Sequence, residues 1–83
     1  MQKYIFTFGS SHLTELKLQV NPMKVILVVE AETMVQARNK VFNSFIGAKW
    51  AFSYNYDHSK EFQDKYGMIE YTLAQLEDMR NED

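Results

Sequence analysis

Four aromatic residues recur at every second position in the segment AKWAFSYNYD, which covers residues 48–57. These residues are Trp50, Phe52, Tyr54 and Tyr56. Successive side chains of a β-strand point to opposite faces, so a strand here would place all four rings on one side. Such a row can fill the core of a small protein, or it can form a platform on which a partner stacks.

The first two rings are expected in the core and the last two at its edge. Burying a large apolar side chain contributes about 1.5–3 kcal/mol, and a domain of 83 residues needs that contribution from several of them. Trp50 and Phe52 are therefore predicted to be buried, with the small residues between the rings facing outward. Tyr54 and Tyr56 carry hydroxyl groups that prefer water or a polar partner. They are predicted to lie at the solvent-exposed end of the row.

Residue types used in hydrolytic chemistry occur in two predicted turns. His12 follows two serines, and His58 lies between Asp57 and Ser59. A serine nucleophile needs a strained turn and an oxyanion hole, and the sequence has no G-x-S-x-G segment. The two histidines also lack the spacing of a metal site. We therefore predict a protein that is not an enzyme and that uses no metal or cofactor.

The same turns are predicted to contact a partner. Loops on a rigid scaffold commonly carry binding residues, and tyrosine and histidine combine an apolar body with a polar tip. Acidic side chains in the segment that follows would steer the protein toward a basic partner. The predicted partner-binding residues are Tyr54, Tyr56, Asp57, His58, His12, Glu61 and Asp64.

The elements that position these residues can be read from hydrophobic periodicity. Alternation predicts strands at 3–8 and 13–20, and an apolar run predicts a central strand at 24–31. At Thr33 the period changes to that of a helix with a capped N-terminus. The apolar stripe of this main helix comprises Met34, Ala37, Val41, Phe42 and Phe45.

The second half of the chain alternates strands and helices. The aromatic strand is expected at 49–56, a short helix at 59–66 and a last strand at 68–73. Residues 76–83 are predicted to form a frayed acidic tail. We expect a single domain spanning 1–83 with an α+β fold. It is predicted to be a two-layer sandwich, in which a mostly antiparallel twisted sheet of four or five strands carries the main and short helices on a single face.

Composition limits the class of protein. The chain contains no cysteine, which excludes disulfides and thiolate zinc sites. Its net charge is −2 and its isoelectric point is about 5.6, whereas a nucleic-acid binder usually carries a basic patch. No apolar run has the length of a bilayer span, and no signal peptide is evident. We predict a cytoplasmic protein without a membrane partner, and the charge disfavours direct binding of nucleic acid.

Three segments resemble a group of small proteins encoded by bacteriophages and integrated elements of Gram-positive bacteria. The segments are KYIFTFGSSH at 3–12, VVEAETMVQARNKVF at 28–42 and GAKWAFSYNY at 47–56, and the region 3–56 that contains them is about two-thirds of the chain. The group has a loop of variable length after its first strand. Here that loop is replaced by LTELKLQVNPM, which is predicted to add a strand.

The resemblance implies a setting in which many small proteins act by binding host proteins. Anti-CRISPR proteins and other inhibitors of bacterial defence are the best-known class, and they are typically short, cysteine-poor and without catalytic motifs. It therefore implies inhibition of a defence system through a host protein, with a CRISPR effector nuclease as the most specific target. Two alternatives stay open. One is a homo-oligomer that sequesters a nucleotide signal in a pocket of Tyr54, Tyr56 and Lys49, and the other is an accessory protein that binds single-stranded nucleic acid.

Overall fold

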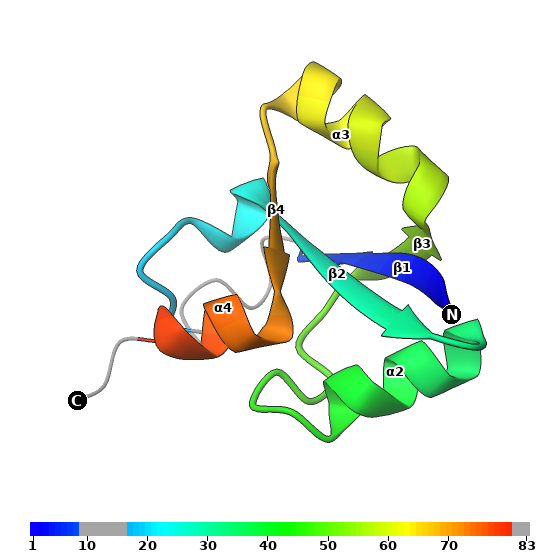
Figure 1. Cartoon of the computed structure of the whole chain (residues 1–83). Helices are drawn as coiled ribbons and strands as arrows, with labels where there is room; N and C mark the ends of the chain where they lie inside the picture. The colour runs from blue at the N-terminus through cyan, green and yellow to red at the C-terminus, as the bar shows by residue number, and fades with distance from the viewer. Residues whose placement is uncertain (9–16, 81–83) are drawn as a thin grey trace.

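The computed structural model describes residues 1–8 and 17–80 of the chain. Its four strands are β1 (Gln2–Thr7), β2 (Val25–Ala31), β3 (Phe52–Asn55) and β4 (Ile69–Thr72). The α-helices are α2 (Met34–Phe42), α3 (Ser59–Tyr66) and α4 (Leu73–Asp78), and short 3₁₀ turns form η2 (Pro22–Lys24) and η3 (Tyr56–His58). The strands make one sheet in the order β3-β1-β2-β4, in which β2 and β4 are parallel and the other pairs antiparallel (Figure 1).

β1 and β2 form the centre of the sheet because both consist largely of β-branched and aromatic residues, which fit a pleated and buried surface. Their alternation places Phe6 and Leu27 on one face, and Ile5 and Ile26 on the other. All four side chains are fully buried. The two central strands are therefore covered on both faces.

Helices α2 and α4 cover the face that holds Phe6. Ala37 and Val41 of α2 are fully buried in this main core. The helix begins at a capped end, since the Thr33 hydroxyl oxygen accepts a hydrogen bond from the N–H of Gln36 at 3.2 Å. The larger of the two cores thus lies between the sheet and these two helices.

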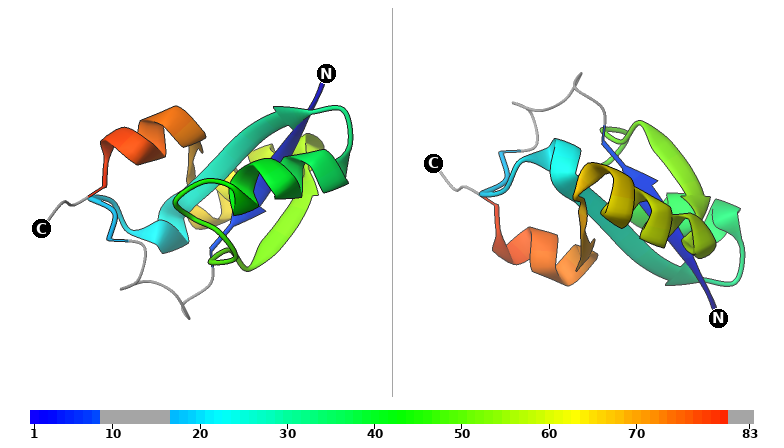
Figure 2. Two further views of the ribbon diagram at one scale, coloured as in Figure 1. Left: turned by 90° about the horizontal axis from the view of Figure 1, so that it is seen from below. Right: turned by 90° about the horizontal axis from the view of Figure 1, so that it is seen from above.

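Helix α3 lies across the opposite face. In Figure 2 it lies in front of the strands in the view from above, whereas α2 does so in the view from below. Phe62 of α3 packs in a smaller core with Ile5, Ile26 and Met68. Gly67 ends the helix in the left-handed region at φ +66°, which glycine adopts without a steric penalty.

The predicted α+β fold is confirmed, with a mixed sheet of four strands. The main helix and the sheet form the expected two layers, but the short helix differs in its placement. Tyr54 lies opposite Ile5 in the register of β3 with β1, so the side chain that contacts Phe62 points to the face that α2 leaves open. The two helices therefore do not share a face.

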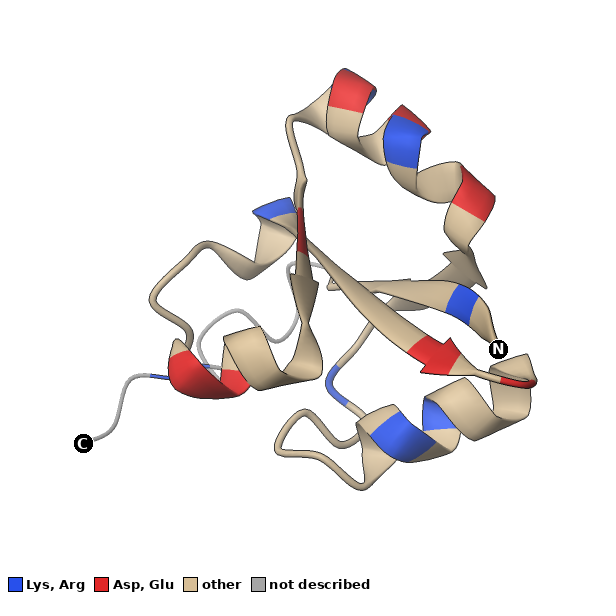
Figure 3. Ribbon diagram, viewed as in Figure 1, with Lys and Arg blue, Asp and Glu red and all other residues tan. Residues whose placement is uncertain are grey.

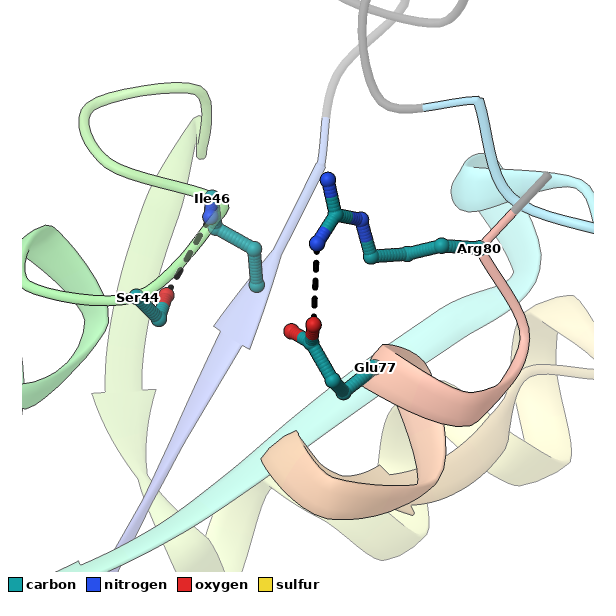
Figure 4. A network of polar contacts seen from close by, with 4 residues as sticks. All are labelled: Ser44, Ile46, Glu77 and Arg80. Atoms are coloured by element: carbon teal, nitrogen blue, oxygen red, sulfur yellow. Dashed lines mark hydrogen bonds and ion pairs between the residues drawn. The ribbon is translucent and has the colours of Figure 1, made fainter. Parts of the chain in front are cut away.

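The segment between α2 and β3 closes one end of the main core. Ile46 is fully buried, and its N–H donates to the Ser44 hydroxyl oxygen at 3.2 Å (Figure 4). Phe42, which the sequence predicts in the buried stripe, is instead 64% exposed. The helix ends at Phe42, and the turn that follows brings Ile46 and the half-buried Phe45 to the core in its place.

The predicted strand at 13–20 lies partly outside the described residues. Of its described part, Leu18 forms one isolated β-bridge with Arg80, and the N–H of Gln19 donates to the carbonyl of Met79 at 2.8 Å. Leu18 and Gln19 therefore contact the end of the chain after α4, and residues 17–20 do not add a strand to the sheet.

The acidic tail predicted at 76–83 begins with residues that the structure places in α4. α4 extends to Asp78, and Leu76 is fully buried in the main core. Arg80 forms an ion pair with Glu77 at 2.8 Å (Figure 4) and places its guanidinium 4.7 Å from the centre of the Phe45 ring. The burial of Leu76 and the contact of Arg80 with Phe45 thus hold a segment whose acidic sequence predicts fraying, while residues 81–83 lie outside the described part.

Candidate functional site

A groove of about 270 Å³ lies between β3 and α3. We call it the aromatic groove. Its apolar lining consists of Phe8, Phe52, Tyr54, Phe62, Tyr66 and Met68.

The rings of this groove form a continuous chain. Tyr54 lies 6.3 Å from Phe52 and 5.1 Å from Phe62 between ring centres, and Phe62 lies 6.3 Å from Tyr66. These separations are those of interacting aromatic pairs. Phe52 is 60% exposed and Tyr66 50% exposed, so the chain is anchored at its middle and open to solvent at both ends.

His58 extends the chain of rings beside α3. Its imidazole lies 5.6 Å from the Tyr54 ring and stacks at 6.5 Å from the Phe62 ring. The 3₁₀ turn that carries His58 leads directly into α3, which brings the imidazole next to Phe62 four residues later. The groove therefore has a polar ring at one rim.

The predicted row of four aromatic residues is divided between the two faces of the sheet. Trp50 packs edge-on against Phe6 of the main core at 5.1 Å but is only partly buried, so its prediction as a buried core residue is confirmed in part. Phe52 was expected beside it but lies exposed on the α3 face, so that prediction is wrong. The physical reason is that β3 begins at Phe52, and the chain before it does not continue the pleat. Ser53 turns toward α2 instead, where it accepts a hydrogen bond from Arg38 at 3.1 Å.

A carboxylate-centred network fastens α3 to β4. Glu70 accepts a hydrogen bond from the Tyr56 hydroxyl at 3.1 Å, a second from the Gln63 amide at 3.1 Å and a third from the Ser59 hydroxyl. The Gln63 amide also donates to the Ser59 oxygen at 3.0 Å, and Ser59 is fully buried. The hydrogen bond to Glu70 raises the pKa of Tyr56, because the neutral phenol is the form that donates to a carboxylate.

The network separates the aromatic groove from a second hollow of about 500 Å³, which we call the polar cavity. It lies where β2 and β4 end and α4 begins, and both Tyr56 and Glu70 contribute to its wall. Lys3 lies beside this wall with its ammonium 5.2 Å from the centre of the Tyr56 ring. The polar cavity therefore lies at the edge of the sheet with walls from both faces, whereas the aromatic groove lies on the α3 face.

Six of the predicted partner-binding residues fall on one continuous stretch from β3 to α3. Tyr54 lines the aromatic groove, Tyr56 lines the polar cavity, and His58 contacts the ring chain. The other three, Asp57, Glu61 and Asp64, are exposed on η3 and α3 (Figure 3). His12 lies outside the described residues.

The pocket expected from Tyr54, Tyr56 and Lys49 is not assembled as one site. The two tyrosines line different hollows. Lys49 belongs to the turn after α2, where its N–H donates to the carbonyl of Ile46 at 3.0 Å. Phe62 and Tyr66, which do line the groove, are visible in the sequence only as an apolar pair four residues apart.

The described residues form neither a metal cage nor a membrane span. In residues 1–8 and 17–80, His, Asp and Glu side chains do not gather in groups of three or more that could hold a metal ion. No helix within these ranges has the length and apolar character that crossing a bilayer requires. Comparison of the chain with protein-family models, curated proteins and solved structures found no significant match.

Proposed function

We propose that the protein acts by binding another protein through the aromatic groove. The observation that carries this proposal is the exposure of Phe52 and Tyr66 at the two ends of a ring chain that is fixed at its centre. Contiguous exposed apolar side chains are uncommon on soluble monomers and commonly mark interaction sites. Aromatic residues on a rigid support also dominate binding energy at protein interfaces.

The charges around the groove favour a partner segment with an apolar anchor and a basic flank. Asp57 and Glu61 are exposed at the His58 end, where a basic residue of the partner would meet them. At the other end, the ammonium of Lys24 donates to the carbonyl of Tyr66 at 2.7 Å. This contact offsets the partial negative charge of the carbonyl groups at the C-terminus of α3. The apolar residue of the partner would occupy the hollow between these ends.

The more specific proposal is that the partner is an effector of a bacterial defence system, with a CRISPR effector nuclease as the narrowest target. This step rests on the sequence resemblance. Asp57, Glu61 and Asp64 are exposed and offer carboxylates to the basic groove of an enzyme that handles nucleic acid, while Lys60 and Lys65 balance the two acidic charges of α3 itself (Figure 3). Binding in that groove would exclude the nucleic acid and block the effector without chemistry.

The first test is capture of host proteins by four forms of the tagged chain. The groove variants are Phe52→Ser and the double variant Phe52→Ser with Tyr66→Ser. Phe42→Ser is a matched control, because Phe42 is also a phenylalanine, is 64% exposed against 60% for Phe52, and lies on α2. We expect a protein that wild type and Phe42→Ser retain and that the groove variants lose. Equal capture by all four forms would contradict the proposal.

The second test addresses the defence effector. Cells with an active defence system would express each form and be challenged with a phage that the system restricts. We expect plaques to return with wild type and Phe42→Ser but not with the double groove variant. If wild type leaves restriction intact in strains whose proteins it captures, the inhibitory role is wrong while protein binding stands.

A further inference from the structure

The polar cavity has the size and the mixed lining of a small-molecule site. Its volume of about 500 Å³ falls within the range of roughly 300–1,000 Å³ that is usual for such pockets. Its apolar wall follows the edge of the sheet: Val28 lies on the α3 face, Val29 and Tyr71 lie on the other face, and Leu73 and Ala74 belong to α4. Polar side chains converge on this wall from β1, β2, α2 and β4, so the pocket combines an apolar surface with a few orienting groups.

The cavity follows from the different lengths of two paired strands. β4 ends at Thr72, which lies opposite Val28, whereas β2 continues to Ala31. After Thr72 the chain turns into α4 beneath the other face (Figure 1). The ammonium of Lys40 reaches from α2 to this edge and donates to the carbonyl of Glu30 at 2.7 Å.

Two cations at the cavity retain capacity for an anion. An ammonium has three donors, and the bond to Glu30 uses one of those of Lys40. Lys3 lies over the face of the Tyr56 ring, and a cation–π contact of this kind leaves its N–H groups able to donate. Both lysines therefore combine full charge with donors that a ligand can accept.

Two acidic residues, Glu30 and Glu70, also line the cavity, but their repulsion of a bound anion is weakened. Glu70 accepts three hydrogen bonds, from Tyr56, Ser59 and Gln63, which spread and stabilise its charge. Glu30 is exposed, so water solvates and screens its carboxylate. The two lysines are the charged groups with donors left for a bound molecule.

We propose that the polar cavity binds a small organic anion, made of a flat apolar body and one carboxylate or phosphate ester. The body packs on Val28, on the α3 face of the sheet edge, and the anionic group accepts hydrogen bonds from Lys40 and Lys3. This inference does not rest on the proposed function, because it concerns a different hollow and different residues.

The test is a titration of the ¹⁵N-labelled full chain with 2-naphthoate and, separately, with adenosine monophosphate, followed by amide chemical shifts. We expect saturable shifts at Val28, Tyr71 and Ala74. The two probes distinguish a carboxylate from a phosphate ester as the preferred anion. The neutral 2-naphthalenemethanol should bind more weakly than 2-naphthoate, since it offers no charge to the lysines.

Three lysine variants locate the site. Lys40→Met and Lys3→Met should each weaken binding roughly tenfold, as expected when a charge-assisted hydrogen bond is lost. Lys65→Met is the matched control, because Lys65 lies 5.5 Å from the Tyr66 ring beside the aromatic groove. If one of the two cavity variants loses the native spectrum, the other still tests the proposal. Shifts confined to Phe52 and Tyr66, equal binding of the neutral alcohol, or the absence of saturable shifts with both anions would each overturn the inference.

Discussion

The two faces of the sheet are covered by helices in different ways. Under α2 and α4, Phe6, Leu27 and Val41 belong to one continuous and fully buried core. Under α3 the buried part is small, and the ring chain that begins there ends in the exposed Phe52 and Tyr66. Aromatic residues of similar size therefore stabilise the fold on one face and remain available to a partner on the other.

The difference lies in what holds each helix to the sheet. α2 contributes the fully buried Ala37 and Val41 to the core, and its hydrogen bonds to the sheet come from the exposed side chains of Arg38 and Lys40. α3 contributes Phe62 to the smaller core and is fastened at its N-terminal half by hydrogen bonds to Glu70. Hydrogen bonds fix a helix without covering apolar area, which leaves a hollow on each side of the network.

The largest expected effect is on the main core. Phe6→Ala should lower the free energy of unfolding by about 3–5 kcal/mol, because it empties a fully buried aromatic site. Such a loss is a large part of the roughly 5–15 kcal/mol that stabilises a domain. Urea unfolding followed by the fluorescence of Trp50, whose ring lies 5.1 Å from Phe6, measures it. A change below about 1 kcal/mol would show that this face is not the principal core.

A second core prediction concerns α4. Leu76→Ala should cost about 2–5 kcal/mol, since Leu76 is fully buried in the main core. Its neighbour provides the control. Glu77→Ala removes an exposed ion pair with Arg80 and should cost no more than about 1 kcal/mol. Equal effects of the two substitutions in thermal unfolding would indicate that α4 frays in solution.

The smallest effect is a dependence of stability on alkaline pH. The hydrogen bond to Glu70 raises the pKa of Tyr56 above its ordinary value of 10.0, so the folded protein holds the phenolic proton more tightly than the unfolded chain. The contribution to stability is complete below pH 10.0 and is lost as the pH rises through the raised pKa. We expect Tm to fall more steeply above pH 10.0 in wild type than in Tyr56→Phe. Parallel curves would contradict the role of the network.

The elements with strong periodicity were predictable from the sequence. The apolar run of β2, the capped start of α2 at Thr33 and the glycine that ends α3 are local signals, and the structure confirms each of them. The face on which α3 packs is not a local property. It depends on the direction in which Tyr54 points once β3 pairs with β1, and periodicity does not define that pairing.

The site was predictable only in part for the same reason. Their hydroxyl groups distinguish Tyr54 and Tyr56 from Trp50, but alternation places all four rings on one face and does not show that β3 begins at Phe52 and leaves that ring exposed. The bond of Tyr56 to Glu70 joins residues 14 positions apart across the sheet. No local pattern indicates such a contact, so the network and the polar cavity become visible only in three dimensions.

The most direct test of the account compares the affinity of the captured partner for two single variants. Phe52→Ala and Phe42→Ala remove the same side chain at similar exposure, from the aromatic groove and from α2 respectively. We predict that Phe52→Ala weakens binding roughly tenfold or more while Phe42→Ala leaves it unchanged. Both variants should unfold within about 1 kcal/mol of wild type. Equal affinities of the two variants, or a loss confined to Phe42→Ala, would contradict the assignment of the aromatic groove as the binding surface.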